Sequence, residues 1–92
     1  MDSIGVGIRE IRNIFEMSRE DLAIVSGLTE DFVALCEDGL IEPTIDDVNA
    51  IATALSIPVS YIVMFSNQAD DPLLNKFKEV TRKVLQLGAE RS

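Results

Sequence analysis

Hydrophobic residues recur at intervals of three and four along most of this 92-residue chain, a spacing typical of amphipathic α-helices. The first row predicts a helix that is capped by Asp2 or Ser3 and runs to about Glu16. Gly5 and Gly7 weaken its first turn, so more than one start is compatible with the pattern. The row consists of Ile4, Ile8, Ile11, Ile14 and Phe15.

The segment from Ser18 to Gly39 predicts two short helices joined by a tight turn. Ser18 caps the first helix with Asp21 as its capping-box partner, and Gly27 ends it because glycine accepts a positive φ. Thr29 caps the second helix, which Gly39 stops. Where two helices that cross at a wide angle must approach, the chain places small or apolar residues, which are Ala23, Leu28, Val33 and Cys36. The segment therefore predicts a helix-turn-helix.

A fourth helix is predicted to begin after Thr44, which has Asp47 three residues on as a capping partner. Its apolar positions are Ile45, Val48, Ile51, Ala52 and Leu55. Pro58 breaks this helix and, with Val59, opens a short and very apolar fifth helix that ends near Phe65. These elements predict an all-α fold with five helices in one body, followed by one amphipathic helix beyond it.

The polar segment 66–71 precedes Asp71-Pro72, a cap followed by proline at the first helical position, and the sixth helix is expected to end before Gly88. Its main apolar row has a 3.5-residue period, flanked by Leu74 and Leu85, and consists of Leu73, Phe77, Val80, Val84 and Leu87. This row predicts a homodimer, with folding back onto its own body as the alternative. We accordingly divide the chain into a helix-turn-helix domain, 1–66, and a linker with a C-terminal dimerisation helix, 67–92.

Composition narrows the class of protein. Hydrophobic residues make up 47% of the chain and mean hydropathy is +0.19, enough for a core and high for so small a domain. One cysteine and no histidine argue against metal sites, cofactors and histidine-based catalysis, so we expect no enzyme. The longest apolar run, 61–65, is too short to span a bilayer, and no secretory segment precedes the first charges. We expect a cytoplasmic protein with no membrane partner.

The net charge of −8 is distributed unevenly. Residues 1–71 carry three basic side chains (Arg9, Arg12 and Arg19) against fourteen acidic ones, and no lysine or arginine lies between Glu20 and Asp71. Residues 72–92 carry five basic side chains against two acidic ones. The predicted helix-turn-helix therefore lacks the cations that favour contact with phosphates.

Many spaced positions together resemble the Cro/lambda-repressor-like, or XRE-type, family over roughly residues 4–65. They are Ile4-Gly5, Ile8, Ile11-Arg12, Ser18, Leu22-Ala23, Ser26-Gly27-Leu28-Thr29, Glu37, Gly39, Pro43, Ile51-Ala52 and Ala54-Leu55. The resemblance implies a dimeric DNA-binding transcriptional regulator whose third helix enters the major groove. By family position, Arg19 would contact a phosphate, and the base-reading residues would be Glu30, Asp31, Phe32 and Leu35.

The base-reading positions depart from the family pattern. The family usually places hydrogen-bond donors there, whereas this chain has two carboxylates and two apolar residues. Carboxylates can accept from a cytosine amino group, but here they would approach phosphates without accompanying cations. The alternative is a helix-turn-helix that acts by protein–protein contact, as an antirepressor or DNA-mimic adaptor that binds a basic protein.

Other polar residues have structural interpretations. The resemblance implies that Arg12 forms an ion pair with Glu37, tying the first helix to the third. Cys36 is expected to be a buried packing residue rather than a redox sensor, and Asp46 with Asp47 suits a helix N-terminus without any ion. The basic residues of the sixth helix could bind nucleic acid, but a solvated face with a Glu79–Lys83 pair is favoured, and they are Lys76, Lys78, Arg82 and Lys83.

Overall fold

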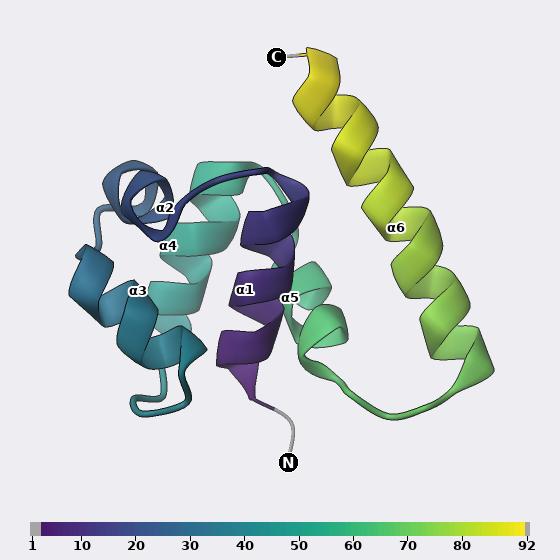
Figure 1. The fold of residues 1–92 in the computed structure, drawn as a ribbon, viewed down its shortest axis with the longest axis horizontal. Coiled ribbons are helices and arrows are strands. Elements are labelled where there is room, and N and C mark those ends of the chain that lie inside the picture. Colours follow the sequence, from purple (N-terminus) through teal and green to yellow (C-terminus); the bar gives the residue numbers. More distant parts are fainter. Residues whose placement is uncertain (1–2, 92) are drawn as a thin grey trace.

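The computed structural model describes residues 3–91, with side chains up to residue 88, and contains six helices and no strand in that range. The prediction of an all-α fold is therefore confirmed. The helices are α1 (Ile4–Ile14), α2 (Arg19–Ser26), α3 (Glu30–Glu37), α4 (Ile45–Leu55), α5 (Val59–Ser66) and α6 (Pro72–Arg91). Figure 1 shows α1 in the middle of the body, with α2, α3 and α4 to one side and α5 and α6 to the other.

The helix boundaries follow the chemistry of the caps. Ser3 accepts a hydrogen bond from the Gly5 amide at the start of α1, and Asp2 lies outside the described residues. Ser18 with Asp21, and Thr44 with Asp47, each form the complete predicted capping box. These polar side chains satisfy amides that the first turn of a helix leaves without partners.

Glycines Gly5 and Gly7 let α1 pack unusually close to two other helices. A Cβ atom on Gly5 would overlap the carbonyl group of Cys36 in α3, and one on Gly7 would overlap Ser66 and the carbonyl oxygen of Ile62 in α5. The two residues that weaken the first turn of α1 therefore permit its main contacts. One core follows from this approach, and it includes Ile8, Ile11, Ile14, Leu22, Val33, Ile51, Ile62 and Phe65.

Three sequence expectations are wrong in detail. Helix α1 ends at Ile14 rather than near Glu16, because Glu16 takes a left-handed conformation with φ 55°. Ile45 opens α4 but is 80% exposed, so it belongs to the surface and not to the buried face. Helix α6 continues through Gly88 to Arg91, because the backbone there stays helical and glycine is tolerated within a helix.

Helix α6 lies beside α1 and α5, and its C-terminal end extends past the body (Figure 1). Leu85 is buried in the common core, so the helix does fold back onto its own domain. The apolar row predicted for dimerisation, by contrast, is not covered by the body. Its five side chains are between 50% and 65% exposed.

Candidate functional site

The α2–α3 pair is held by a turn with the expected geometry. Gly27 has φ 73°, and the amide of Leu28 donates to the carbonyl of Ala23, closing the end of α2. Thr29 then caps α3 by accepting from the amide of Phe32 at 3.1 Å. Ala23 and Val33 are buried where the helices meet. The outer surface of α3 is thereby fixed relative to the body.

The four side chains expected to read bases lie on α3 with different exposure. Glu30 and Asp31 are exposed at its first turn, whereas Phe32 and Leu35 are only partly exposed. None of the four forms a hydrogen bond or ion pair through its side chain that would hold it in a defined direction, among the interactions found in the described part of the chain. The polar chemistry that α3 offers at its start is therefore that of two free carboxylates.

Glu37, at the end of α3, is the centre of the polar interactions of the body. Its side chain is 0% exposed, and Arg12 of α1 binds it with both arms, Nε to Oε2 at 2.8 Å and Nη2 to Oε1 at 2.9 Å. The third donor of Arg12 reaches the carbonyl of Met17 at 2.8 Å. The expected Arg12–Glu37 contact is present, in the planar two-bond geometry that guanidinium and carboxylate groups favour.

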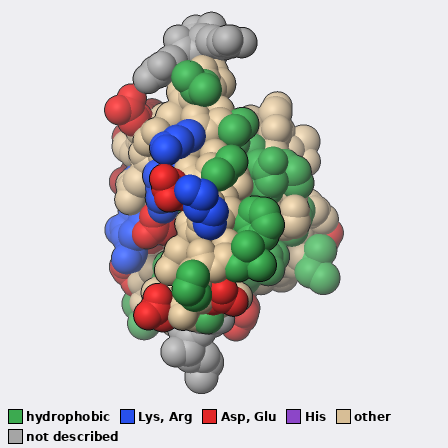
Figure 2. Space-filling model, turned by 90° about the vertical axis from the view of Figure 1, so that its right-hand side faces the viewer, with side chains coloured by type: hydrophobic (Ala, Val, Ile, Leu, Met, Phe, Trp, Pro, Cys, Tyr) green, Lys and Arg blue, Asp and Glu red, His purple; other side chains and the backbone are tan. Residues whose placement is uncertain are grey.

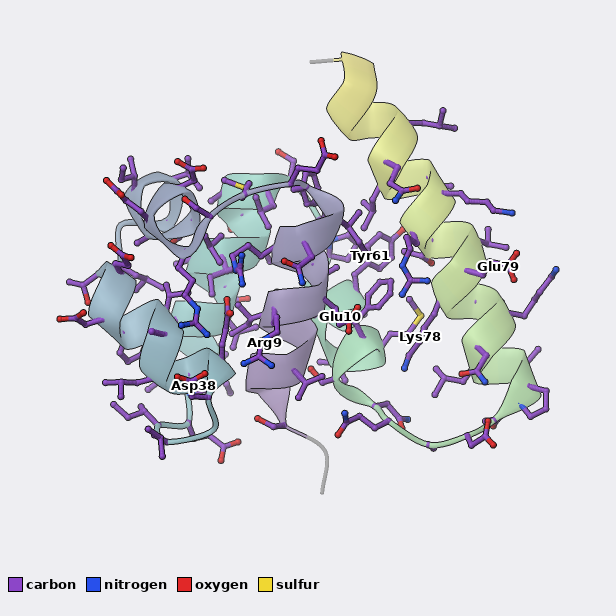
Figure 3. All side chains as sticks on the ribbon, viewed as in Figure 1. Arg9, Glu10, Asp38, Tyr61, Lys78 and Glu79 are labelled. Atoms are coloured by element: carbon purple, nitrogen blue, oxygen red, sulfur yellow. The ribbon has the colours of Figure 1, made fainter. Side chains whose placement is uncertain are left out.

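Two further arginines complete this cluster. Arg19 donates to Glu37 Oε1 at 3.2 Å and to Asp38 Oδ1 at 3.1 Å. Arg9 donates to the Glu37 carbonyl at 2.9 Å and to Asp38 Oδ1 at 3.3 Å, and Figure 3 shows Arg9 on the side of α1 that faces Asp38. All three basic residues of 1–71 are thus bound to two adjacent acidic residues, Glu37 and Asp38.

The cluster holds Glu37 in its charged form. Burial alone would raise the pKa of Glu37, but the hydrogen bonds and charges of Arg12 and Arg19 outweigh burial and lower its pKa. The same hydrogen bond from Arg19 to Glu37 raises the pKa of Arg19. Arg19, expected at a phosphate by family position, is therefore committed to an internal partner.

Sequence reasoning missed Arg9 and Asp38 as members of this cluster. Both residues could have been assigned to the cluster from the sequence. Arg9 precedes Arg12 by three residues and so shares its helix face, and Asp38 follows Glu37 directly. What the sequence did not show is that the last turn of α3 lies within reach of arginines from two separate helices, α1 and α2.

Helix α6 turns two of its basic side chains toward the body and its main apolar row toward solvent. Arg82 lies over the ring of Phe65, 5.4 Å from its centroid, and its guanidinium is 3.8 Å from Glu10. Lys78 donates to the carbonyl of Asn67, and in Figure 3 it points from α6 toward the body while Glu79 points away. The expected Glu79–Lys83 pair is present at 3.2 Å, and Lys83 lowers the pKa of Glu79.

Figure 2 looks at the molecule from the α6 side and shows hydrophobic side chains running along this face with lysines and arginines beside them. The apolar row of α6 has the members expected from the sequence, which are Leu73, Phe77, Val80, Val84 and Leu87. The residues that face the body instead include Leu74, Lys78, Arg82 and Leu85. The structure therefore brings the predicted dimerisation residues together on one open face.

Two hollows lie on different parts of the molecule. One, of about 640 Å³, lies between α6 and the ends of α1 and α4, and Phe15, Leu55 and Val84 are among its lining residues. The other, of about 260 Å³, lies where the start of α4 meets α5, and is lined by Ile45, Val63 and Glu42 with others. Both are mainly apolar.

Other candidate chemistry is limited. Cys36 is buried, and burial followed by the charges of Asp47 and Glu37 raises its pKa. Within residues 3–91, no group of three or more histidine, cysteine, aspartate or glutamate side chains is placed to hold a metal ion. No single described helix is long and apolar enough to cross a membrane, although α4 and α5, bent by 110°, meet that test of length and composition as a pair.

Comparison with known proteins adds no relative: no protein-family model matches the chain, and no curated protein or solved structure is significantly similar to it.

Proposed function

We propose that this chain is a regulatory helix-turn-helix protein of the Cro/lambda-repressor-like type whose α2–α3 surface binds a basic protein rather than duplex DNA. The observation that carries the proposal is that Arg9, Arg12 and Arg19 form hydrogen bonds and ion pairs with Glu37 and Asp38 inside the protein. The proposed protein is a homodimer, since α6 exposes an apolar row. It has no enzymatic activity.

The helix-turn-helix assignment is supported by the local geometry of α2 and α3. A left-handed Gly27, a Thr29 cap and a buried Ala23 are the features that a short turn between two crossing helices requires. The Arg12–Glu37 pair is the internal contact that the family resemblance implied. These features support the helix-turn-helix assignment and leave open which macromolecule its outer surface binds.

The electrostatics of this surface oppose DNA. A duplex gains affinity when protein cations replace its counterions, and this term supplies most non-specific binding. The Nε and Nη2 atoms of Arg19 already donate to Glu37 and Asp38, so a phosphate would compete with two carboxylates for this guanidinium. Glu30 and Asp31 would meanwhile face the phosphates. The same exposed carboxylates suit lysine- or arginine-rich protein surfaces.

A second candidate is an operator-binding regulator of the XRE type. The specific observation in its favour is that Glu30 and Asp31 stand free at the first turn of α3, the part of a recognition helix that contacts base edges. Each can accept a hydrogen bond from a cytosine amino group. In this candidate, the cations would come from α6, where Lys76 and Lys83 are exposed.

Salt-dependent DNA binding distinguishes the two candidates. Fluorescence anisotropy of random duplex DNA, from low to physiological salt, should give weak binding and a salt slope that corresponds to roughly two phosphate contacts or fewer. A variant with Lys76, Lys78, Arg82 and Lys83 changed to glutamine separates any contribution of α6. Tight binding that is steeply salt-dependent and survives these four changes would overturn the proposal.

Binding of a lysine-rich helical peptide tests directly whether the α2–α3 surface recognises a basic protein. The peptide should bind the wild-type chain at low salt and bind less tightly to a Glu30→Gln, Asp31→Asn variant. The matched control is Glu16→Gln with Asp70→Asn, which also removes two exposed carboxylates but from positions outside α3. Equal loss in both variants would mean that only net charge is sensed, and would contradict a specific role for α3.

A further inference from the structure

Helix α6 leaves its main apolar row uncovered, although Leu74 and Leu85 face the body. A surface helix normally turns its apolar stripe to the core and its charges to water. Here Lys78 and Arg82 contact the body, whereas Phe77, at 56% exposure, and its neighbours in the row do not. Long basic side chains can cover apolar surface with their stems, so this inner contact is tolerated. The outer face is left without a partner.

A second apolar surface on the same molecule also lacks a partner. The hollow between the start of α4 and α5, here called the α4–α5 groove, has Ile45 and Val63 on its lining, both at least half exposed. Leu40 and Ile41, in the loop before α4, are exposed nearby in the chain. Carboxylates accompany the groove, because Glu42 lines it and Asp46 is the exposed neighbour of Ile45.

We propose that the α6 row of one copy packs into the α4–α5 groove of a second copy, and that the second copy returns the same contact about a two-fold axis. The inference deepens the proposed function and rests on it only in taking the protein as a homodimer. A reciprocal contact of this kind closes into a dimer and leaves no surface free to propagate a fibre. Figure 1 shows that the C-terminal end of α6 extends past the body.

Charge complementarity favours the groove over an antiparallel pairing of two α6 helices. Lys76 and Lys83 are exposed on α6 beside the apolar row, one residue before Phe77 and Val84. Against the groove, these lysines meet Glu42 and Asp46. In an antiparallel pair of α6 helices they would meet the lysines of the other copy, and like charges that face each other oppose association.

Buried area also favours the groove. The five side chains of the row are between 50% and 65% exposed and share one face, which makes them an apolar patch of the kind that marks an interaction site. Ile45 and Val63 of the groove are 80% and 50% exposed, so a contact that covers both surfaces in each copy buries more apolar area than one that covers the row alone. Pairing of two α6 rows would leave the groove bare.

Sedimentation equilibrium, or light scattering over a range of concentrations, tests the inference with two apolar variants. Phe77→Asp with Val84→Asp, on the row, and Ile45→Asp with Val63→Asp, in the groove, should each yield a monomer with the helices of the body intact by circular dichroism. All four residues are at least half exposed, so we expect the buried core to tolerate these changes. The matched control is Ile24→Asp, at an exposed apolar residue outside both surfaces, which should leave the dimer unchanged.

Charge reversal sharpens the test. Lys76→Glu with Lys83→Glu should weaken the dimer at least tenfold, and adding Glu42→Lys with Asp46→Lys should restore most of that loss. A wild-type monomer at high micromolar concentration would overturn the inference. So would a dimer that is lost in the row variant and kept in the groove variant, because that result indicates pairing of two α6 helices.

The result is separable from that of the DNA titration. A monomer with a shallow salt slope would overturn this inference and leave the proposed function standing. A dimer with the expected rescue but steep, tight DNA binding would overturn the proposed function alone.

Discussion

Helices α1 and α6 carry apolar rows of similar spacing, and the molecule uses them in opposite ways. The row of α1 is buried, with Ile8 and Ile11 in the centre of the core. The row of α6 faces solvent. The difference lies in the residues beside the row, since Gly5 and Gly7 let other helices approach α1 closely, whereas α6 meets its own body with Leu85 and the long side chains of Lys78 and Arg82. Periodicity identifies a face, and the neighbouring residues decide what covers it.

Glycine-to-alanine substitutions should give the largest difference in stability between α1 and α6. Gly5→Ala places a methyl group against the backbone carbonyl of Cys36, which cannot move without displacing α3, so we expect a loss of more than about 4 kcal/mol or no cooperative unfolding. Gly88→Ala meets nothing within 4 Å in a helix and should raise stability by up to about 1 kcal/mol. Urea unfolding followed by circular dichroism measures both. Equal effects of the two changes would contradict the close approach of α1.

The ion pairs of the two helices should differ nearly as much. Arg12→Met leaves Glu37 buried with one strong partner removed, which costs about 3–5 kcal/mol and lowers the melting temperature clearly. Lys83→Met removes an exposed pair with Glu79 and should change the free energy of unfolding by less than about 0.5 kcal/mol. Thermal unfolding of the two variants checks this. An unchanged transition in Arg12→Met would show that the Glu37 cluster does not stabilise the body.

The apolar rows themselves give the next contrast. Ile11→Ala opens a cavity in the core and should cost about 2–5 kcal/mol of unfolding free energy. Phe77→Ala removes an exposed ring and should change the stability of the monomer by less than about 0.5 kcal/mol when measured at low micromolar concentration. At high concentration, the same variant should lose stability relative to wild type, because the proposed dimer contact is weakened. A large loss at low concentration would place Phe77 in the monomer core.

The smallest expected difference between the two regions is in how their carboxylates affect stability at acid pH. The pKa of Glu37 is lowered in the folded chain, so its contribution to stability is complete above the ordinary glutamate pKa of about 4.3 and is lost as pH falls from there through the lowered value. Glu37→Gln should therefore be less stable than wild type at pH 7 and lose less further stability between pH 5 and pH 3. Glu79→Gln, at an exposed pair, should follow the wild-type acid curve closely. Parallel curves for Glu37→Gln and wild type would contradict the lowered pKa.

Sequence reasoning succeeded where one residue determines a local conformation. The caps Ser18, Thr29 and Thr44 and the left-handed Gly27 are found where their chemistry places them, because each acts on amides or dihedrals within a few residues. The Arg12–Glu37 contact was also anticipated, although from family resemblance and not from spacing. The placement of α6 against α1 and α5 follows from tertiary packing, which no local pattern specifies.

The misses share a physical cause. From the sequence, Gly5 and Gly7 are predicted to destabilise the first turn of α1, because the cost of glycine in a helix is local. Their benefit is close contact with Cys36 and Ser66, which lie on segments distant in the chain. Ile45 reads as a core residue by its spacing, yet it starts its helix at the edge of the body and stays exposed. In the candidate site, the exposed residues of α3 and α6 were predicted from the sequence, but the ion pair between Arg19 and Glu37 was not.

The chain has one cysteine, and its position makes it an intrinsic reporter of motion in the body. Cys36 is buried beside the closest approach of α1 to α3, so a thiol reagent reaches it only when these helices separate. The rate of labelling under native conditions therefore measures the free energy of that opening without any engineered probe. Because α6 carries no cysteine, loosening of α6 alone would leave the rate unchanged, so labelling in the natural sequence times the opening of the body by itself.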